Sequence, residues 1–177
     1  MIPYYQSIPE LGIKGRYNAP EEFDKIGLPK DLEGWDVLDI GCNIGAFLLE
    51  CDWRGAYSIT GVEVDDYFRA EAEDVMEKMG VPKENFMIFK DLDSLEREIG
   101  GLTYDLVLLL SVTHVVEGMS GQEILDKAWA LTKRLLIVEI NDRLQKEKIV
   151  LPEGAKFYGK NKDERSVYHI FKNNNVN

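Results

Sequence analysis

Cysteine, histidine and long apolar runs are all scarce in this sequence of 177 residues. Its two cysteines, Cys42 and Cys51, have a spacing that fits no metal-binding motif. Free thiols suit a reducing compartment, so we expect a cytoplasmic protein. The longest apolar run, residues 106–110, is far too short to span a bilayer, and the first residues show no signal-peptide pattern. We therefore expect neither a bound metal nor a membrane partner.

Basic residues are also fewer than acidic ones. The chain has 32 acidic residues against 21 lysines and arginines, a formal net charge of −11 at pH 7. Residues 31–105 contain 19 acids and 6 bases, whereas residues 133–177 contain 10 bases and 6 acids. Proteins that bind polyanions such as nucleic acids usually show a strongly basic surface. The acidic charge of this chain therefore disfavours a nucleic-acid partner. A local basic patch in the C-terminal part keeps that alternative open.

What the sequence does contain is a regular alternation of strand and helix patterns. A S-x-x-E capping box, Ser120 and Glu123, precedes the last helix of the series. Five β-α repeats followed by a hairpin predict an α/β fold: a doubly wound, Rossmann-like, seven-stranded sheet, mostly parallel with an antiparallel C-terminal hairpin. The expected strands are residues 37–40, 58–63, 86–89, 104–110, 134–140, 155–158 and 166–171, and the expected helices are residues 44–53, 65–79, 92–99 and 124–131.

The N-terminal part precedes this alternation. We expect residues 1–33 to form a separate segment and residues 34–177 to form the ligand-binding domain. Asn18 begins a helix with an early proline and acids, and Gly27 ends it. The aromatic and basic residues of the segment either fold over the ligand as a lid that excludes water or form a loosely packed tail. They are Tyr4, Tyr5, Arg16 and Tyr17.

The most informative motif is the strand, loop and helix at residues 37–47. Gly41 and Gly45 allow the backbone to turn sharply and to approach a ligand closely. Asp39 is placed to accept a hydrogen bond from an ammonium group, and the start of the following helix offers N–H groups to a carboxylate. The spacing is G-x-x-x-G rather than G-x-G-x-x-G, so a cofactor with an amino-acid end fits better than a pyrophosphate. The alternative is a tight turn without a ligand.

Acidic residues also follow the next two strands. Glu63 lies at the tip of strand 58–63, where a carboxylate can accept both hydroxyls of a ribose. Alternatively, it caps the next helix alongside Asp65 and Asp66. Asp91 follows strand 86–89 and can accept from the adenine amine, while Leu92 packs on the ring. A helix cap is the other interpretation of Asp91, and the two roles can coexist.

Together these motifs resemble the class I S-adenosylmethionine-dependent methyltransferases over roughly residues 34–172. The resemblance implies S-adenosylmethionine as cofactor and S-adenosylhomocysteine as product. A weaker resemblance, through residues 5–8, 27–34 and 54–56, is to the tRNA wobble-uridine methyltransferase-like and small-molecule methyltransferase group. The chain lacks that group's large additions and its Pro-Gly-Gly before strand five. The cofactor-binding residues expected are Asp39, Gly41, Cys42, Asn43, Gly45, Phe47, Glu63, Val64, Asp91, Leu92 and Ser111.

Candidate catalytic residues follow strand 104–110. His114, which comes after Ser111 and Thr113, could serve as a general base toward an acceptor hydroxyl or amine. Methyl transfer from a sulfonium can also proceed by proximity and orientation alone, and His114 then only packs or contacts the adenine. Glu117 and Glu139 are weaker candidates on the same rim. His169 is expected to be structural, in an edge strand.

The function predicted is methyl transfer from S-adenosylmethionine to an oxygen or nitrogen of a small-molecule acceptor. Three alternatives remain: an RNA (tRNA) or protein methyltransferase, a non-catalytic S-adenosylmethionine-binding subunit, and a nucleotide-dependent oxidoreductase. The last would need a glycine where Asn43 stands. The sequence leaves the acceptor and the oligomeric state open.

Overall fold

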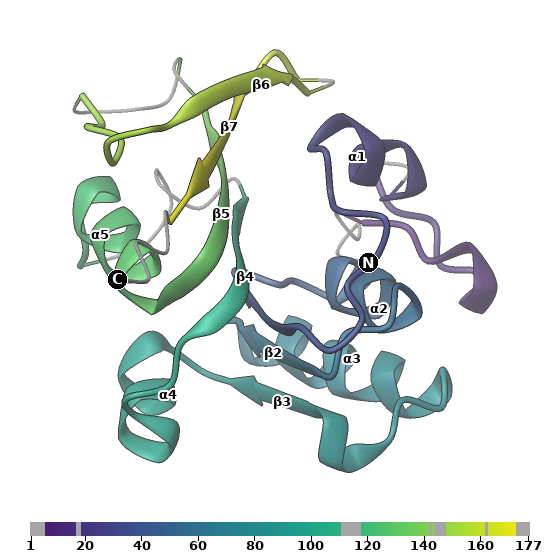
Figure 1. Cartoon of the computed structure of the whole chain (residues 1–177). Coiled ribbons are helices and arrows are strands. Elements are labelled where there is room, and N and C mark those ends of the chain that lie inside the picture. The colour runs from purple at the N-terminus through teal and green to yellow at the C-terminus, as the bar shows by residue number, and fades with distance from the viewer. Residues whose placement is uncertain are drawn as a thin grey trace.

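A seven-stranded sheet with the order β3-β2-β1-β4-β5-β7-β6 forms the centre of the computed structural model (Figure 1). The structure describes residues 6–16, 19–110, 118–141, 143, 148–161 and 163–172. The first five strands are parallel, and β7 is antiparallel to both β5 and β6, as predicted. The strands are β1 (Asp36–Ile40), β2 (Ser58–Val62), β3 (Phe86–Phe89), β4 (Tyr104–Leu110), β5 (Thr132–Ile140), β6 (Lys156–Lys160) and β7 (Ser166–Phe171).

The position of β7 corrects one expectation. His169 lies in β7, which is an interior strand between β5 and β6, whereas the prediction placed it at an edge. Most β7 residues are buried, while β6 is exposed along almost its whole length. The more apolar strand therefore takes the interior position, although β6 comes first in the chain.

Helices cover both faces of the sheet, with α1, α2 and α3 on one side and α4 and α5 on the other (Figure 1). The predicted capping box of α5 is present, with Ser120 and Glu123 each bonded to the other's backbone. Within the described ranges, no helix has the length and apolar character needed to cross a membrane. The helices are α1 (Ala19–Lys25), α2 (Ala46–Trp53), α3 (Asp66–Lys78), α4 (Leu92–Ile99) and α5 (Gly121–Leu131), with 3-10 turns η1 (Pro9–Leu11) and η2 (Lys83–Asn85).

Several element boundaries differ from the prediction by one to three residues, and two of the differences have a clear local reason. Helix α2 begins at Ala46 rather than at residue 44, because Gly45 has a left-handed backbone with φ of 81°. Strand β5 begins at Thr132, immediately after α5 and two residues earlier than predicted. The Thr132 hydroxyl donates to the Ala128 carbonyl at 2.8 Å, so this side chain ends the helix while its backbone is already extended.

Side chains of the central strands alternate between two hydrophobic cores. On β4, Leu106 and Leu108 face the core under α1, α2 and α3, whereas Val107 and Leu109 face the core under α4 and α5. All four are fully buried. A strand covered on both faces has no polar side to present, which explains its unbroken apolar run.

The segment before β1 packs into the first of these cores. Arg54 at the end of α2 donates to the carbonyls of Leu28 and Pro29, at 2.6 and 2.9 Å, and so holds this segment against the helix. The buried side chains that it contributes to the core are Ile8, Phe23, Ile26, Leu28 and Leu32.

The carboxyl ends of four parallel strands meet at one edge. Ile40 at the end of β1 is in register with Val62 of β2 and Leu109 of β4, and Val62 is in register with Phe89 of β3. Parallel α/β sheets bind ligands outside this edge. The residues that follow these strands therefore define the candidate site.

Candidate functional site

The glycine loop after β1 folds back onto the end of β2. Gly41 N and Cys42 N both donate to the Val62 carbonyl, at 2.7 and 3.1 Å. Gly41 has a φ of 83° and Asn43 a φ of 52°, so two residues before Gly45 also adopt the left-handed region. Such backbone favours glycine and is tolerated by asparagine. The sharp turn that the motif predicted is therefore present.

Asp39 is a buried carboxyl on β1, just before this loop. The residue is 2% exposed. Within the described part of the chain, no group donates a hydrogen bond to it. Burial, and secondarily the negative charge of Glu63, raise the pKa of Asp39 from 3.8 to about 8. A buried polar group without a partner is costly, and such perturbed acids mark candidate functional sites.

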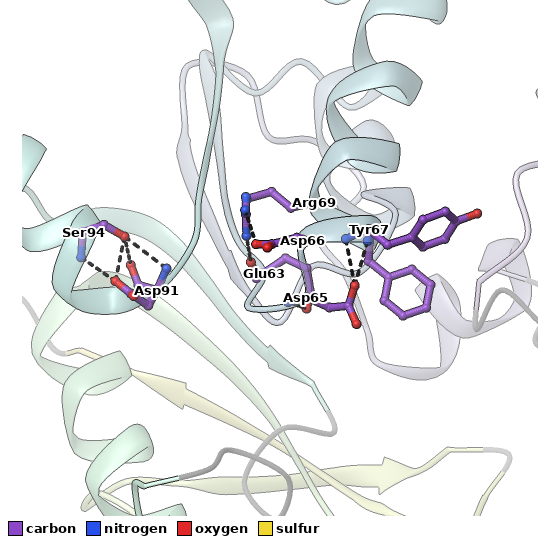
Figure 2. A network of polar contacts seen from close by, with 8 residues as sticks. Glu63, Asp65, Asp66, Tyr67, Arg69, Asp91 and Ser94 are labelled. Atoms are coloured by element: carbon purple, nitrogen blue, oxygen red, sulfur yellow. Dashed lines mark hydrogen bonds and ion pairs between the residues drawn. The ribbon is translucent and has the colours of Figure 1, made fainter. Parts of the chain in front are cut away.

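Glu63 at the tip of β2 joins the glycine loop to the start of α3. Its two carboxylate oxygens accept from Asn43 N at 2.9 Å and from Asp65 N at 3.0 Å. The cap of α3 is Asp65, whose Oδ1 accepts from Tyr67 N and Phe68 N (Figure 2). A carboxylate has about four lone-pair positions, so Glu63 can accept two further hydrogen bonds.

Asp91 after β3 caps helix α4. Its Oδ1 accepts from Ser94 N and from Ser94 Oγ, each at 2.7 Å, and the Ser94 hydroxyl also faces Asp91 N (Figure 2). These bonds, first that from the Ser94 hydroxyl, hold the pKa of Asp91 below its usual value. The structure thus confirms that Asp91 caps α4. An adenine contact by the same side chain stays a prediction.

The other predicted cofactor residues have varied surroundings. Val64 is 60% exposed at the tip of β2, and Leu92 is half-buried against the second core. Phe47 is buried and packs edge-on against Phe23 of α1, with ring centroids 4.9 Å apart. Asn43 has a buried Oδ1 without a hydrogen-bond partner in the described part of the chain. Only Val64 among these presents a large apolar side chain to the exterior.

The Cys42 thiol is buried and packs against Gly61 of β2. Its Sγ lies 2.7 Å from the position that a Cβ on Gly61 would occupy. Burial, followed by the charges of Asp39 and Glu63, raises the pKa of this thiol well above its usual value. Cys42 can therefore face a ligand through its backbone alone.

The candidate catalytic segment falls outside the described residues. This applies to Ser111, Thr113, His114 and Glu117 after β4, and also to Tyr4, Tyr5 and Tyr17 of the predicted lid.

Glu139 and His169, also singled out from the sequence, make contacts that join elements of the fold. The buried carboxylate of Glu139 accepts from Asn161 Nδ2 at 2.5 Å and from Arg165 Nη1 at 2.9 Å, which holds the connection between β6 and β7. His169 is buried, with Nε2 2.7 Å from the Ile26 carbonyl, and its ring stacks on Tyr158 with centroids 4.3 Å apart. It ties β7 to the segment after α1.

Gln6 contacts the start of α2, a contact that sequence reasoning missed. It is 7% exposed, and its Oε1 accepts from Ala46 N, the first residue of α2, at 3.2 Å. The two residues are 40 positions apart. A lid is one expectation from the aromatic residues before Gln6, but no local pattern predicts a contact between Gln6 and α2.

Comparisons with known proteins establish the fold. No family model and no curated protein matches the sequence. Many solved structures are similar to it, including the following three. Magnesium protoporphyrin IX methyltransferase from Synechocystis PCC 6803, crystallised with bound S-adenosylmethionine, is 16% identical with a TM-score of 0.64, over 87% of this chain and 77% of that one. The bifunctional kinase-methyltransferase WbdD is 17% identical with a TM-score of 0.73, over 96% and 44%.

The third is YhhF from Escherichia coli, a candidate methyltransferase, 13% identical with a TM-score of 0.65 over 88% of each chain. This chain spans less than half the length of the WbdD chain and most of the other two. At such identities the similarity concerns the fold. The protein has the class I fold of the S-adenosylmethionine-dependent methyltransferases.

Proposed function

We propose that this protein is an S-adenosylmethionine-dependent methyltransferase that transfers a methyl group to an oxygen or nitrogen of a small molecule. The observation that carries the proposal is Asp39, a buried carboxyl with no donor among the described residues, beside a glycine loop at the ligand edge of the sheet. An acid without a partner in that position suits a ligand that brings a cation of its own.

The residues around this edge fit the cofactor. Asp39 would accept from its ammonium group and Glu63 from the two ribose hydroxyls, since each oxygen of Glu63 already bonded to backbone retains a lone pair. Val64, Leu92 and Asp91 would form the adenine side. When bound, the cofactor supplies an electrophilic methyl group on a sulfonium.

The chain's own contribution to the reaction is orientation. Holding an acceptor in line with the methyl group accounts for a large part of such rate enhancements. We propose that His114 takes the proton from the acceptor hydroxyl or amine, and that Ser111 contributes to binding of the cofactor. The acidic stretch that contains the site, residues 31–105, favours a small acceptor over a polyanion. We place the protein in the cytoplasm, since both cysteines are free thiols.

Calorimetric titration with S-adenosylmethionine, S-adenosylhomocysteine and NAD tests the proposal. We expect micromolar binding of both sulfur compounds and none of NAD. Glu63→Gln keeps the size of the side chain but removes its charge, and should weaken S-adenosylhomocysteine binding about tenfold, as for one lost hydrogen bond to a charged group. Glu77→Gln, on the exposed side of α3, is the matched control and should bind like wild type. Unchanged affinity in Glu63→Gln would contradict the ribose assignment.

A panel of acceptors then separates the alternatives. Methyl transfer to small hydroxyl or amine compounds supports the proposal. Firm cofactor binding without transfer to any acceptor would favour a non-catalytic subunit. Affinity for tRNA that falls steeply with salt would favour an RNA substrate.

A further inference from the structure

Residues 6–16 form a short hairpin that is anchored in the core. Ile8 and Ile13 exchange two backbone hydrogen bonds of 3.0 Å, with η1 in the loop between them. The Ile8 side chain is 2% exposed and belongs to the core that α2 also lines. The hairpin is therefore fixed relative to α2.

Gly15 holds the backbone of Gln6 in place. A Cβ on Gly15 would lie 2.1 Å from both the carbonyl carbon and the carbonyl oxygen of Gln6. Only a glycine permits the two arms of the hairpin to come this close. The arms therefore position Gln6 with little freedom, and its side chain is buried.

The amide of Gln6 has a defined orientation. Because Ala46 N is a donor, the atom that accepts from it at 3.2 Å is Oε1. The Nε2 group of the same amide carries two N–H donors that this hydrogen bond does not use. Gln6 thus places donor groups next to the first turn of α2.

The glycine loop itself has few backbone donors left for an anion. Gly41 N and Cys42 N donate to Val62 O, and Asn43 N donates to the Glu63 carboxylate. Gly45 N donates to Cys42 O at 2.9 Å. A side chain that brings donors to this loop would therefore add to the few that remain for a carboxylate.

We propose that Gln6 recognises the carboxylate of the cofactor's amino-acid end, while its Oε1 stays on Ala46 N–H. This inference rests on the proposed function, and it makes Gln6, which the hairpin positions, part of the cofactor site. The amide of Gln6 would then bind the carboxylate of that end, and the carboxyl group of Asp39 would bind its ammonium group.

The test compares S-adenosylmethionine with decarboxylated S-adenosylmethionine, which lacks only the carboxylate. Gln6→Glu keeps an oxygen for Ala46 N–H but replaces the donor with a negative charge. It should lose at least tenfold in affinity for S-adenosylmethionine and bind the decarboxylated compound as well as wild type or better. Lys14→Gln, at an exposed position of the same hairpin, should leave both affinities unchanged. Calorimetry gives the affinities, and circular dichroism checks the fold.

Should Gln6→Glu fail to fold, Gln6→Met keeps the side-chain length without donors and should lose the preference for S-adenosylmethionine over the decarboxylated compound. Equal losses for both compounds would show a packing role and overturn the proposal. Tighter binding of S-adenosylmethionine itself in either variant would show that Gln6 blocks the site, and would also overturn the proposal. A wild-type protein that binds neither compound would contradict the proposed function itself, whereas one that binds both equally would contradict only the role of Gln6.

Discussion

Two aspartates lie near the carboxyl ends of β1 and β3, the parallel strands on either side of β2, yet their surroundings are opposite. Asp39 on β1 is buried and accepts from no group in the described part of the chain, and its pKa is raised to about 8. Asp91 after β3 accepts twice from Ser94 and its pKa is lowered. Asp91 stabilises the fold whether or not a ligand binds. No described group stabilises the carboxylate of Asp39 in the folded chain, so we expect its hydrogen-bond partner to be a ligand.

Asp39→Asn should have the largest effect on this contrast. The substitution preserves shape but removes the charge that would pair with the cofactor ammonium. We expect a loss of about ten- to a hundredfold in S-adenosylmethionine affinity, as for one hydrogen bond to a charged group. Asp91→Asn, which keeps the helix cap, is the matched comparison. Isothermal titration measures both, and equal affinities for wild type and Asp39→Asn would contradict the assignment.

The same substitution should increase stability. The folded pKa of Asp39 lies above its unfolded value of 3.8, so the native state retains a proton that the unfolded state has lost. The free energy of unfolding attributable to Asp39 therefore falls as pH rises from about 4 to about 8. At pH 7, Asp39→Asn should be more stable by up to about 4 kcal/mol. Urea denaturation at pH 5 and pH 7 checks this, since the difference between the proteins should grow with pH.

Cofactor affinity should depend on pH through the same group. Below a pKa of about 8, Asp39 is protonated in the free protein and must lose its proton to pair with an ammonium group. S-adenosylmethionine affinity should therefore rise by up to about tenfold per pH unit between pH 6 and pH 8. Titrations in buffers of different ionisation enthalpy would count the released proton. A profile in Asp39→Asn as steep as that of wild type would assign the dependence to another group.

The smallest effect is expected at Asp91. Asp91→Ala removes the cap of α4 and should lower the free energy of unfolding by about 1 kcal/mol, whereas Asp91→Asn should change it by a few tenths. If Asp91 also accepts from the adenine amine, Asp91→Asn raises the cofactor Kd severalfold at unchanged stability. Thermal melts together with titration separate the two roles. Wild-type affinity in Asp91→Asn would leave Asp91 a helix cap alone.

Much of the fold followed from local patterns. The bounds of β3, β4, β7 and α4 agree with the predicted segments, because apolar runs and capping residues act over a few neighbours. The capping box at Ser120 and Glu123 is an example in which both hydrogen bonds are present. The expectation for His169 was wrong in one respect, since chain order does not determine which strand of a hairpin enters the sheet.

Two local features of the candidate site could be predicted from the sequence, whereas a long-range contact could not. The glycine turn and the acid at the tip of β2 were readable from spacing, and the fold of similar structures is that of the S-adenosylmethionine-dependent methyltransferases. The hydrogen bond between Ala46 N and Gln6 Oε1 could not be predicted from the sequence, because it depends on how a hairpin 40 residues away packs on α2.

Sequence alone determined which residues form strands, turns and caps, since those choices depend on side chains within one or two turns of chain. Tertiary structure decided how much water each polar group retains. Asp39 and Asp91 are the same residue type at the same edge of the sheet, and burial in the assembled sheet raises one pKa while a neighbouring serine lowers the other. Desolvation depends on everything packed around a group, so it is defined only when the whole chain has folded.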